Sequence, residues 1–238
     1  MSKKILLLSG DPNSINSEII FKSWKILNNS IKKIIYIISN YNLIKDQFKK
    51  LKYKTKVCKV KNINELSNSN KIKILNIDLK YKNSFKVPFS SNVNFLNKSL
   101  NFAHKLSLNT KVGGLINCPI NKNLLTKENI GLTEFFAAKC KIKKDSEVML
   151  IRNEKLSVTP ITTHIRLKDV SKKINKNLII NKIKTLELWF KKYENKKPKI
   201  CLLGLNPHNA ELKKNSEEQK ILIPVIRKLR KMGIRING

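Results

Sequence analysis

Short apolar segments alternate with amphipathic ones along the first 60 residues, and this alternation constrains the fold more than any other feature of the chain. Residues 5–8 form a continuous apolar run typical of a buried strand, and the Gly10-Asp11-Pro12 turn follows it. Apolar residues then recur at helical spacing over 17–28. The pattern continues with a strand at 33–39, a helix at 43–51 and a strand at 55–60. This alternation with short loops predicts an α/β fold with a mostly parallel sheet.

The rest of the chain contains the same kinds of element after a stretch rich in Asn, Ser and Lys at 61–90. That stretch predicts a loop region with one short strand near Ile74. Helices are expected at 92–108, 177–193 and 219–232, and strands at 113–117, 148–151, 156–159, 200–203 and 234–236. The length of 238 residues suits one large domain or two small ones with a proper core.

The formal net charge of +34 suggests a nucleic-acid binder at first. The charge comes from 45 Lys and only 5 Arg, accompanied by 30 Asn and 32 Ile. Lys, Asn and Ile have A/T-rich codons, whereas Arg is preferred for bidentate contacts to bases and phosphates. The lysines are spread along the chain rather than gathered in a stripe. We therefore favour a biased, solvated surface and expect no specific nucleic-acid partner.

The four cysteines and the apolar runs bear on the cellular location. Cys58, Cys118, Cys140 and Cys201 lie far apart without CxxC spacing, as expected for reduced cytosolic thiols. No apolar run approaches the ~20 residues that span a membrane. We expect a cytoplasmic protein without a membrane partner.

Two of the three histidines follow predicted strands. His164 ends the Thr162-Thr163-His164 stretch, and His208 follows the strand predicted at 200–203. Ligands of open α/β sheets bind beyond the carboxyl ends of strands, and two neutral imidazoles there can share a divalent cation. Two ligands do not complete a site. The alternative is that each histidine is an ordinary loop residue, as we expect for His104 on its helix.

The usual cofactor motifs are missing from the sequence. The turn after the first strand is not GxGxxG, only seven glycines occur in the chain, and neither a P-loop nor GxSxG is found. From the residues alone, a dinucleotide site of the common kind is not supported.

Five segments taken together resemble the 4-hydroxythreonine-4-phosphate dehydrogenase family of pyridoxal-phosphate biosynthesis. They are Gly10-Asp11-Pro12 with Ile15 and Glu18, Pro119-Ile120-Asn121-Lys122, Gly131-Leu132-Thr133-Glu134-Phe135, the run from Thr162 to Val170, and Gly204-Leu205-Asn206-Pro207-His208 with Glu211, Glu217, Glu218, Ile223 and Pro224. Each is weak alone, but their order along nearly the whole chain is specific.

The resemblance implies an α/β/α fold of the isocitrate/isopropylmalate-dehydrogenase type with two lobes, approximately 1–118 and 119–238. That superfamily binds NAD without the GxGxxG loop. The implied reaction is the NAD- or NADP-dependent oxidation of 4-phosphooxy-L-threonine, followed by loss of carbon dioxide to give an amino-ketone phosphate. A divalent metal (zinc, magnesium or cobalt) would polarise the hydroxyl and then the ketone.

The resemblance also implies roles for particular residues. His164 and His208 match two of three metal ligands, at a site shared across a homodimer interface. Leu132 and Thr133 occupy substrate-binding positions, and Lys122 lies where a cation could meet phosphate or carboxylate, as a catalytic candidate.

Three departures from the family pattern bear on these expectations. Leu132 replaces the histidine of the family motif, which removes one polar contact to substrate. Asn and Ser replace glycines in the first loop, and we expect that loop to survive because Asn tolerates left-handed backbone. The family continues beyond Gly238 by roughly a quarter of its length, so we expect the C-terminal part of the fold, with the third metal histidine, to be missing. A partial gene product and a natural truncated relative are both compatible with this end.

Other functions remain open at this point. A dehydrogenase of a related phosphorylated four-carbon acid is the first alternative, prompted by Leu132. An inactive relative that keeps the dimer surface is the second, and a basic nucleic-acid-binding protein is the least favoured.

Overall fold

The structure is a computed structural model that describes residues 2–65, 70–125, 131–142, 146–163, 165–205, 208 and 214–238. The chain divides into two compact units, Met1–Gly131 and Leu132–Gly238, and each is described by itself. The lobes that the resemblance implies, with a boundary near residue 118, stay a prediction.

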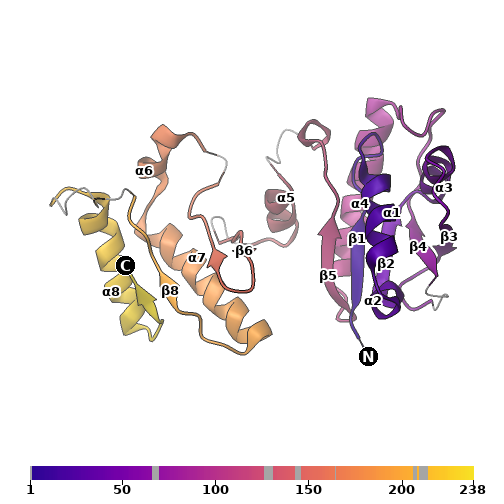
Figure 1. Ribbon diagram of the computed structural model, residues 1–238. Coiled ribbons are helices and arrows are strands. Elements are labelled where there is room, and N and C mark those ends of the chain that lie inside the picture. The colour runs from indigo at the N-terminus through magenta and orange to yellow at the C-terminus, as the bar shows by residue number, and fades with distance from the viewer. Residues whose placement is uncertain are drawn as a thin grey trace. The chain divides into compact units, whose positions relative to one another are not determined.

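The first unit is built on a five-stranded parallel sheet, which confirms the predicted α/β class (Figure 1). The strands, in the order β3-β4-β2-β1-β5 across the sheet, are β3 (Lys56–Val60), β4 (Lys71–Asn76), β2 (Ile35–Ser39), β1 (Lys4–Leu8) and β5 (Val112–Asn117). All pairings are parallel. The strands are short apolar runs because both faces of a parallel sheet are covered by helices.

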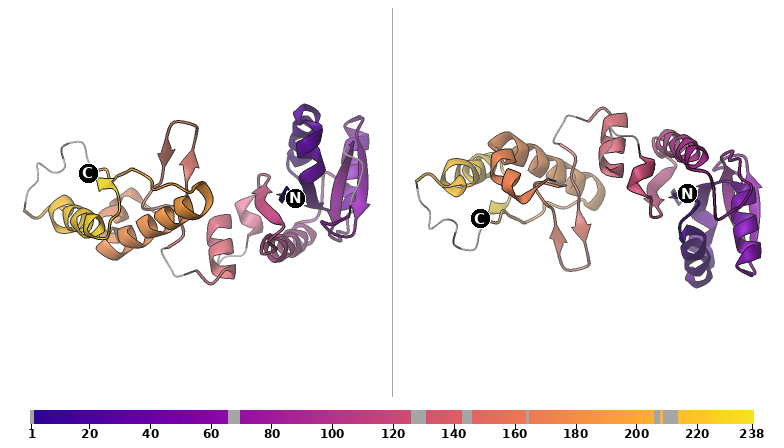
Figure 2. Two further views of the ribbon diagram at one scale, coloured as in Figure 1. Left: turned by 90° about the horizontal axis from the view of Figure 1, so that it is seen from below. Right: turned by 90° about the horizontal axis from the view of Figure 1, so that it is seen from above.

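Helices cover both faces of this sheet. Helices α1 (Asn16–Ile26) and α3 (Tyr41–Lys50) bury Ile20, Trp24, Ile44 and Phe48 in one cluster with alternate strand residues such as Ile37 and Ile74. Helix α4 (Phe89–Ser107) lies against β1, β2 and β5. Figure 2 shows α1 and α4 on opposite sides of the strand that begins at the N-terminus.

Two details of the first unit differ from the sequence prediction. An additional helix, α2 (Asn29–Ile34), precedes β2, because the Asn28 side chain caps it by accepting a hydrogen bond from the Ile31 N–H at 2.9 Å. Strand β4 is a full strand of the sheet rather than a short one in a loop region. The strand prediction at 33–39 was therefore two residues too early at its start.

The position of β1 in the sheet determines where a ligand site can form. Strand β1 pairs with β2 on one side and with β5 on the other, so the chain leaves β1 in one direction and returns on the opposite side. Such a reversal leaves a crevice at the carboxyl ends of the two central strands, which is the usual ligand position in open α/β sheets.

The second unit contains shorter strands and several helices, and these bounds follow the chain. The elements are α5 (Leu132–Lys139), β6 (Ile151–Arg152), β7 (Ser157–Val158), α6 (Val170–Lys173), α7 (Lys176–Trp189), β8 (Ile200–Cys201), α8 (Ile223–Lys231) and β9 (Ile236–Asn237). β6 and β7 form an antiparallel hairpin around the predicted turn at Asn153-Glu154, and β8 pairs with β9 in parallel. Strands β6, β7 and β8 are shorter than predicted. Helix α5 was not predicted.

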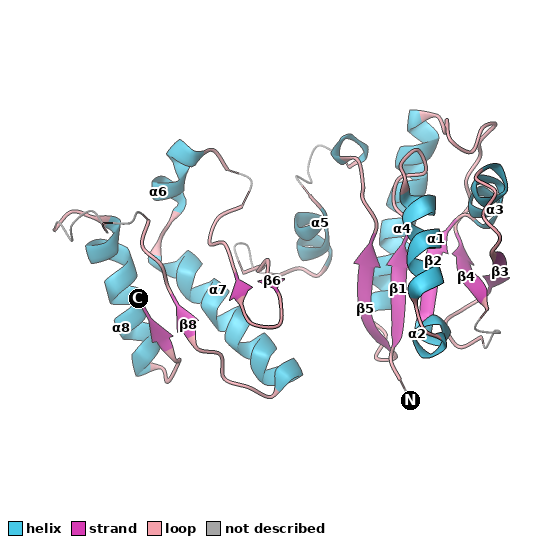
Figure 3. Ribbon diagram, viewed as in Figure 1, coloured by secondary structure: helices cyan, strands magenta, loops and turns pink. Residues whose placement is uncertain are grey.

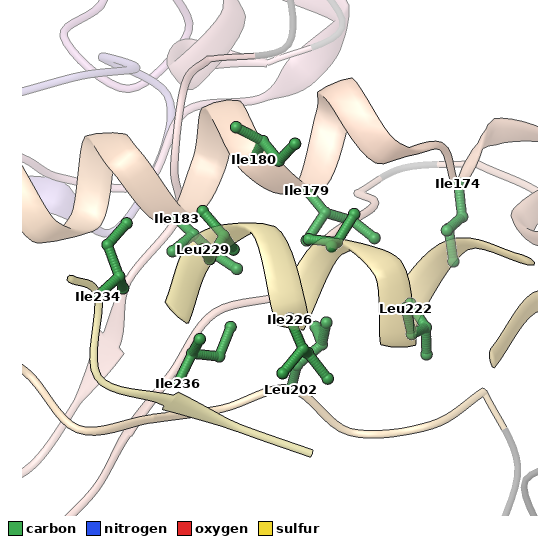
Figure 4. Packing of buried hydrophobic residues seen from close by; sticks show 11 residues of the cluster. Ile174, Ile179, Ile180, Ile183, Leu202, Leu222, Ile226, Leu229, Ile234 and Ile236 are labelled. Atoms are coloured by element: carbon green, nitrogen blue, oxygen red, sulfur yellow. The ribbon is translucent and has the colours of Figure 1, made fainter. Parts of the chain in front are cut away.

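An apolar cluster between α7 and α8 forms the core of this unit (Figure 4). Ile179 and Ile183 of α7 meet Ile226 and Leu229 of α8, and Ile236 of β9 closes the cluster on the other side of α8. Ile179 and Leu229 are fully buried. The 3.6-residue spacing that predicted both helices is thus the spacing of this core. Of the helices in the described residues, none is both long and apolar enough to cross a membrane.

Candidate functional site

The loop that follows β1 is a tight turn built around the buried Asp11. The Ser14 N–H donates to the Asp11 carbonyl at 3.2 Å, and the Asn13 N–H donates to Asp11 Oδ1 at 2.9 Å. The same Oδ1 accepts a hydrogen bond from Asn92 Nδ2 of α4 at 2.7 Å. Pro12 fixes the backbone at the second position of the turn. This loop lies at the carboxyl edge of the sheet (Figure 3).

Carboxamide side chains hold the outer part of this loop. Asn13 donates to the Val87 carbonyl at 2.9 Å and accepts from the Val87 N–H at 2.8 Å. Gln47 of α3 donates to the carbonyls of Pro12 at 2.9 Å and Ser84 at 2.6 Å. Each of these bonds ties the loop to a segment distant in sequence, so the turn has one defined arrangement.

The loop keeps its conformation for a different reason from the one expected. Within the described residues, the non-glycine positions with positive φ are Lys52, Lys141 and Asn195, so no Asn or Ser of the first loop adopts left-handed backbone. Gly10 does, with a φ of 71°. The expectation that left-handed Asn preserves the loop was wrong, because side-chain hydrogen bonds preserve it instead.

The segment after β5 carries Lys122 at the same edge of the sheet. The Cys118 N–H donates to the Leu8 carbonyl at 2.9 Å, and burial raises the pKa of the Cys118 thiol to about 11. Lys122 is exposed and begins a short 3₁₀ helix, η1 (Lys122–Leu124). Asn121 caps this turn by accepting from the Asn123 N–H at 3.1 Å. The Lys122 ammonium group can therefore meet a solvent-borne anion beside the first loop.

Leu132 and Thr133 are the first two residues of α5, in the second unit. Leu132 is half-buried and Thr133 is exposed, while Phe135 of the same helix is buried. A hydroxyl at this helix start can donate to a substrate oxygen, whereas Leu132 offers only apolar contact.

The two predicted metal ligands cannot be brought together from the described residues. His164 lies outside them. His208 is exposed in a turn. Among the residues that the structure describes, no group of three or more His, Cys, Asp or Glu side chains could hold a metal ion. The metal site stays a prediction, resting on the imidazole donors and not on a formed cluster.

Glu218 is a residue at this site whose role the sequence reasoning missed. It is 4% exposed and lies in the π-helical turn Glu218–Leu222 before α8. Its Oε1 accepts a hydrogen bond from the Leu205 N–H at 3.1 Å, in the segment that leads to His208. The Glu217-Glu218 pair in the fifth motif was the signal that could have identified it. The carboxylate fixes the start of the loop that carries His208.

A cavity of about 380 Å³ lies within the second unit, beside the two histidine motifs. Leu167, Lys168 and Ser171 line it from the segment that follows His164, and Leu203 and Leu205 line it from the segment that precedes His208. Its walls are mainly apolar with a few polar groups, which is typical of a small-molecule pocket.

Comparison with known proteins identifies relatives along almost the entire chain. Residues 19–238 match the family model described as pyridoxal phosphate biosynthetic protein PdxA. A 4-hydroxythreonine-4-phosphate dehydrogenase of Sulfurihydrogenibium sp. (strain YO3AOP1) is 34% identical over 98% of this chain and 72% of its own length. The enzyme of that name from Aquifex aeolicus (strain VF5) is 32% identical over 100% of this chain and 74% of its own length.

Solved structures show the same fold. A 4-hydroxythreonine-4-phosphate dehydrogenase from Klebsiella pneumoniae superposes with a TM-score of 0.85 at 23% identity, covering 100% of this chain and 74% of that one. A terephthalate 1,2-cis-dihydrodiol dehydrogenase from Burkholderia xenovorans LB400 superposes with a TM-score of 0.62 at 17% identity, covering 100% of this chain and 73% of that one. At these identities the likeness concerns the fold alone. The match of the family model and the sequence relatives carry more, and by them this chain is a member of the PdxA family of pyridoxal phosphate biosynthetic proteins.

Proposed function

We propose that the chain catalyses the NAD- or NADP-dependent oxidation and decarboxylation of 4-phosphooxy-L-threonine. The C3 hydroxyl loses a proton and a hydride, the hydride passes to the nicotinamide ring, and a β-keto acid forms. Loss of carbon dioxide from that acid, with protonation of the remaining carbanion equivalent, leaves an amino-ketone phosphate.

One observation supports this proposal above the others. The Gly10-Asp11-Pro12 motif directly follows β1, the Pro119-Ile120-Asn121-Lys122 motif follows β5, and the motif that ends at His208 follows β8. All three family motifs therefore occur at the carboxyl ends of strands, where open α/β folds bind their substrates.

The residues have separate tasks in this proposal. The Lys122 ammonium group attracts the phosphate or carboxylate of the substrate, and the Thr133 hydroxyl hydrogen-bonds to it. His164 and His208 would hold a divalent cation such as zinc, magnesium or cobalt. A cation bound there supplies Lewis-acid polarisation of the substrate oxygen. Glu218 holds the backbone before His208 through Leu205, so that the imidazole is presented from a fixed loop. The residues that bind NAD or NADP are not assigned.

The decisive experiment is a turnover assay on the full product of the reading frame. NAD(P)H formation is followed after addition of 4-phosphooxy-L-threonine, with NAD or NADP and with zinc, magnesium or cobalt. We expect turnover that falls at least about 100-fold in His208→Ala, because one lost metal ligand typically removes the Lewis acid. Absence of turnover with every cofactor and metal would contradict the proposal.

A second candidate function is the oxidation of a related phosphorylated four-carbon acid. Leu132 favours it, because an apolar side chain stands where the family motif has a hydrogen-bonding histidine. The TM-score of 0.62 to a dehydrogenase of another named substrate agrees with the view that this fold serves several alcohols. A panel of threonine, threonate and erythronate phosphates separates the two candidates. Leu132→His should shift the preference towards the threonine phosphate if the first candidate is correct.

Further proposals concern partners and location. We propose a cytoplasmic homodimer with the metal site at its interface, to be tested by light scattering and by metal content of the wild type against His164→Ala. Retained metal in that variant would contradict the site. Binding to nucleic acid should be weak and should disappear with added salt, because it would rest on dispersed lysines alone.

A further inference from the structure

The side chain of Asn16 links two loops that are 103 residues apart in sequence. Asn16 is the first residue of α1 and is 3% exposed. Its Nδ2 donates to the Pro119 carbonyl at 2.8 Å and to the Asp11 carbonyl at 3.3 Å. One amide group thus connects the loop after β1 to the segment after β5.

The surroundings of Asn16 leave its amide a single orientation. Both partners are carbonyl oxygens, so a flipped amide would set oxygen against oxygen. Gly10 packs closely beneath it: a Cβ at that position would lie 2.7 Å from the Pro119 oxygen and 2.8 Å from Asn16 Nδ2. The Asp11 side chain is itself fixed by Asn92 and by the Asn13 N–H. The contact is therefore a built feature and not a chance approach of two surface groups.

The contact fixes the segment that carries Lys122. Residue 118 is bound through its N–H to the Leu8 carbonyl, and residue 119 is bound through its carbonyl to Asn16. The 3₁₀ turn that begins at Lys122 follows three residues after Pro119. We propose that Asn16 is a positioning residue, which holds the Pro119 carbonyl so that η1 presents the Lys122 ammonium group at the carboxyl edge of the sheet. This inference rests on the proposed function where it concerns Lys122.

The device belongs to this sequence rather than to the motif that it resembles. Asn16 stands where the GDPxGIGPE pattern has a glycine, and a glycine has no side chain with which to reach Pro119. An N–H donor at this position replaces backbone freedom with a fixed connection between two loops.

Cys118 is a built-in reporter of this connection. It precedes Pro119 directly, it is 4% exposed, and the exposed Cys140 and Cys201 serve as internal references for reagent access. Alkylation by iodoacetamide at pH 8, with each site quantified by mass spectrometry, measures how often the segment opens. Asn16→Asp is nearly isosteric but has no N–H to donate, and Asn16→Gly is the second variant if the aspartate impairs folding.

Loss of these hydrogen bonds should raise the alkylation rate of Cys118 about tenfold in both Asn16 variants. The matched control is Asn13→Ala, which removes a loop contact to Val87 and leaves the Pro119 contact intact. Its Cys118 rate should stay within about threefold of wild type. Equal protection of Cys118 in all these proteins would overturn the connection, whether or not the chain has dehydrogenase activity.

A thermodynamic cycle then tests the link from Asn16 to Lys122. The Kd of 4-phosphooxy-L-threonine is measured by calorimetry for wild type, Asn16→Asp, Lys122→Met and the double variant. We expect Asn16→Asp to weaken binding about fivefold in the Lys122 background and less than about twofold in the Met background. Full additivity would overturn the positioning role and point to a purely structural one. Failure of the wild type to bind this ligand would refute the proposed substrate, while the alkylation rates would still decide the connection.

Discussion

Lys73 is a buried lysine in the middle of the parallel sheet, and its replacement gives the sharpest stability prediction. It is 1% exposed on β4, its Nζ donates to the Lys33 carbonyl at 2.6 Å, and Nζ lies 4.2 Å from the centroid of the Tyr36 ring. Burial, with a smaller contribution from the nearby charge of Lys4, lowers the pKa of Lys73 to about 8 from an ordinary value of 10.5.

The sign and size of the effect follow from this difference. Because the folded state binds the proton less tightly than the unfolded state, the free energy of unfolding rises with pH between about 8 and 10.5. Below pH 8 both states carry the proton, and the stability from the neutral amine is lost. A shift from 10.5 to about 8 corresponds to about 3 kcal/mol, of which about 2 to 3 kcal/mol falls between pH 7 and pH 10.

The perturbation is Lys73→Met, and the readout is the difference in unfolding free energy between wild type and variant across pH. Urea unfolding is followed by the fluorescence of Trp24, with Trp189→Phe in every protein so that only the first unit reports. The wild type should gain about 2 to 3 kcal/mol over the variant between pH 7 and pH 10. Lys71→Met, at an exposed position of the same strand, should run parallel to wild type. Parallel curves for Lys73→Met as well would refute the buried-cation reasoning.

Three further changes test other parts of the fold by urea unfolding. Gly10→Ala should lower the free energy of unfolding by about 2 to 4 kcal/mol, since a Cβ would be strained at φ 71° and would disrupt the bond to Pro119; Gly114→Ala, with open space around its Cβ position, should cost far less, and equal costs would contradict this account. Leu229→Ala, fully buried between α7 and α8, should cost about 2 to 5 kcal/mol, against less than about 0.5 kcal/mol for the half-exposed Met232→Ala. Arg152→Ala should cost less than about 1 kcal/mol, because its two bonds to the Glu194 carboxylate are exposed to solvent, and a larger loss would show that the hairpin depends on them.

The parts of the fold that the sequence predicted well are those with an unbroken apolar pattern. Strands β1, β2 and β5 are continuous apolar runs, and α7 and α8 repeat apolar residues at helical spacing. Strand β4 was underestimated because Lys71 and Lys73 interrupt its apolar pattern. Only the tertiary structure shows that Lys73 is buried against Tyr36 and the Lys33 carbonyl. Helix α2 was missed because its start depends on the Asn28 cap, and Asn is too common in this chain to signal a cap on its own.

The candidate site was predictable only as far as its motifs. Their order placed Lys122 and His208 after strands, and the structure agrees that each follows a strand. The contacts that hold those motifs join residues far apart in sequence. Asn16 meets Pro119, and Glu218 meets Leu205, through polar atoms whose pairing no local pattern reveals. Long-range hydrogen bonds of this kind depend on the packed sheet and helices.

The central claim is that this member of the PdxA family oxidises and decarboxylates a phosphorylated hydroxythreonine. The most direct measurement is the stoichiometry of the two products, NAD(P)H by absorbance and carbon dioxide by isotope release from carboxyl-labelled 4-phosphooxy-L-threonine. The account predicts equal amounts of both, formed only with a divalent metal and reduced strongly in His208→Ala. Release of neither product, or NAD(P)H formation with threonate or erythronate phosphate alone, would contradict it.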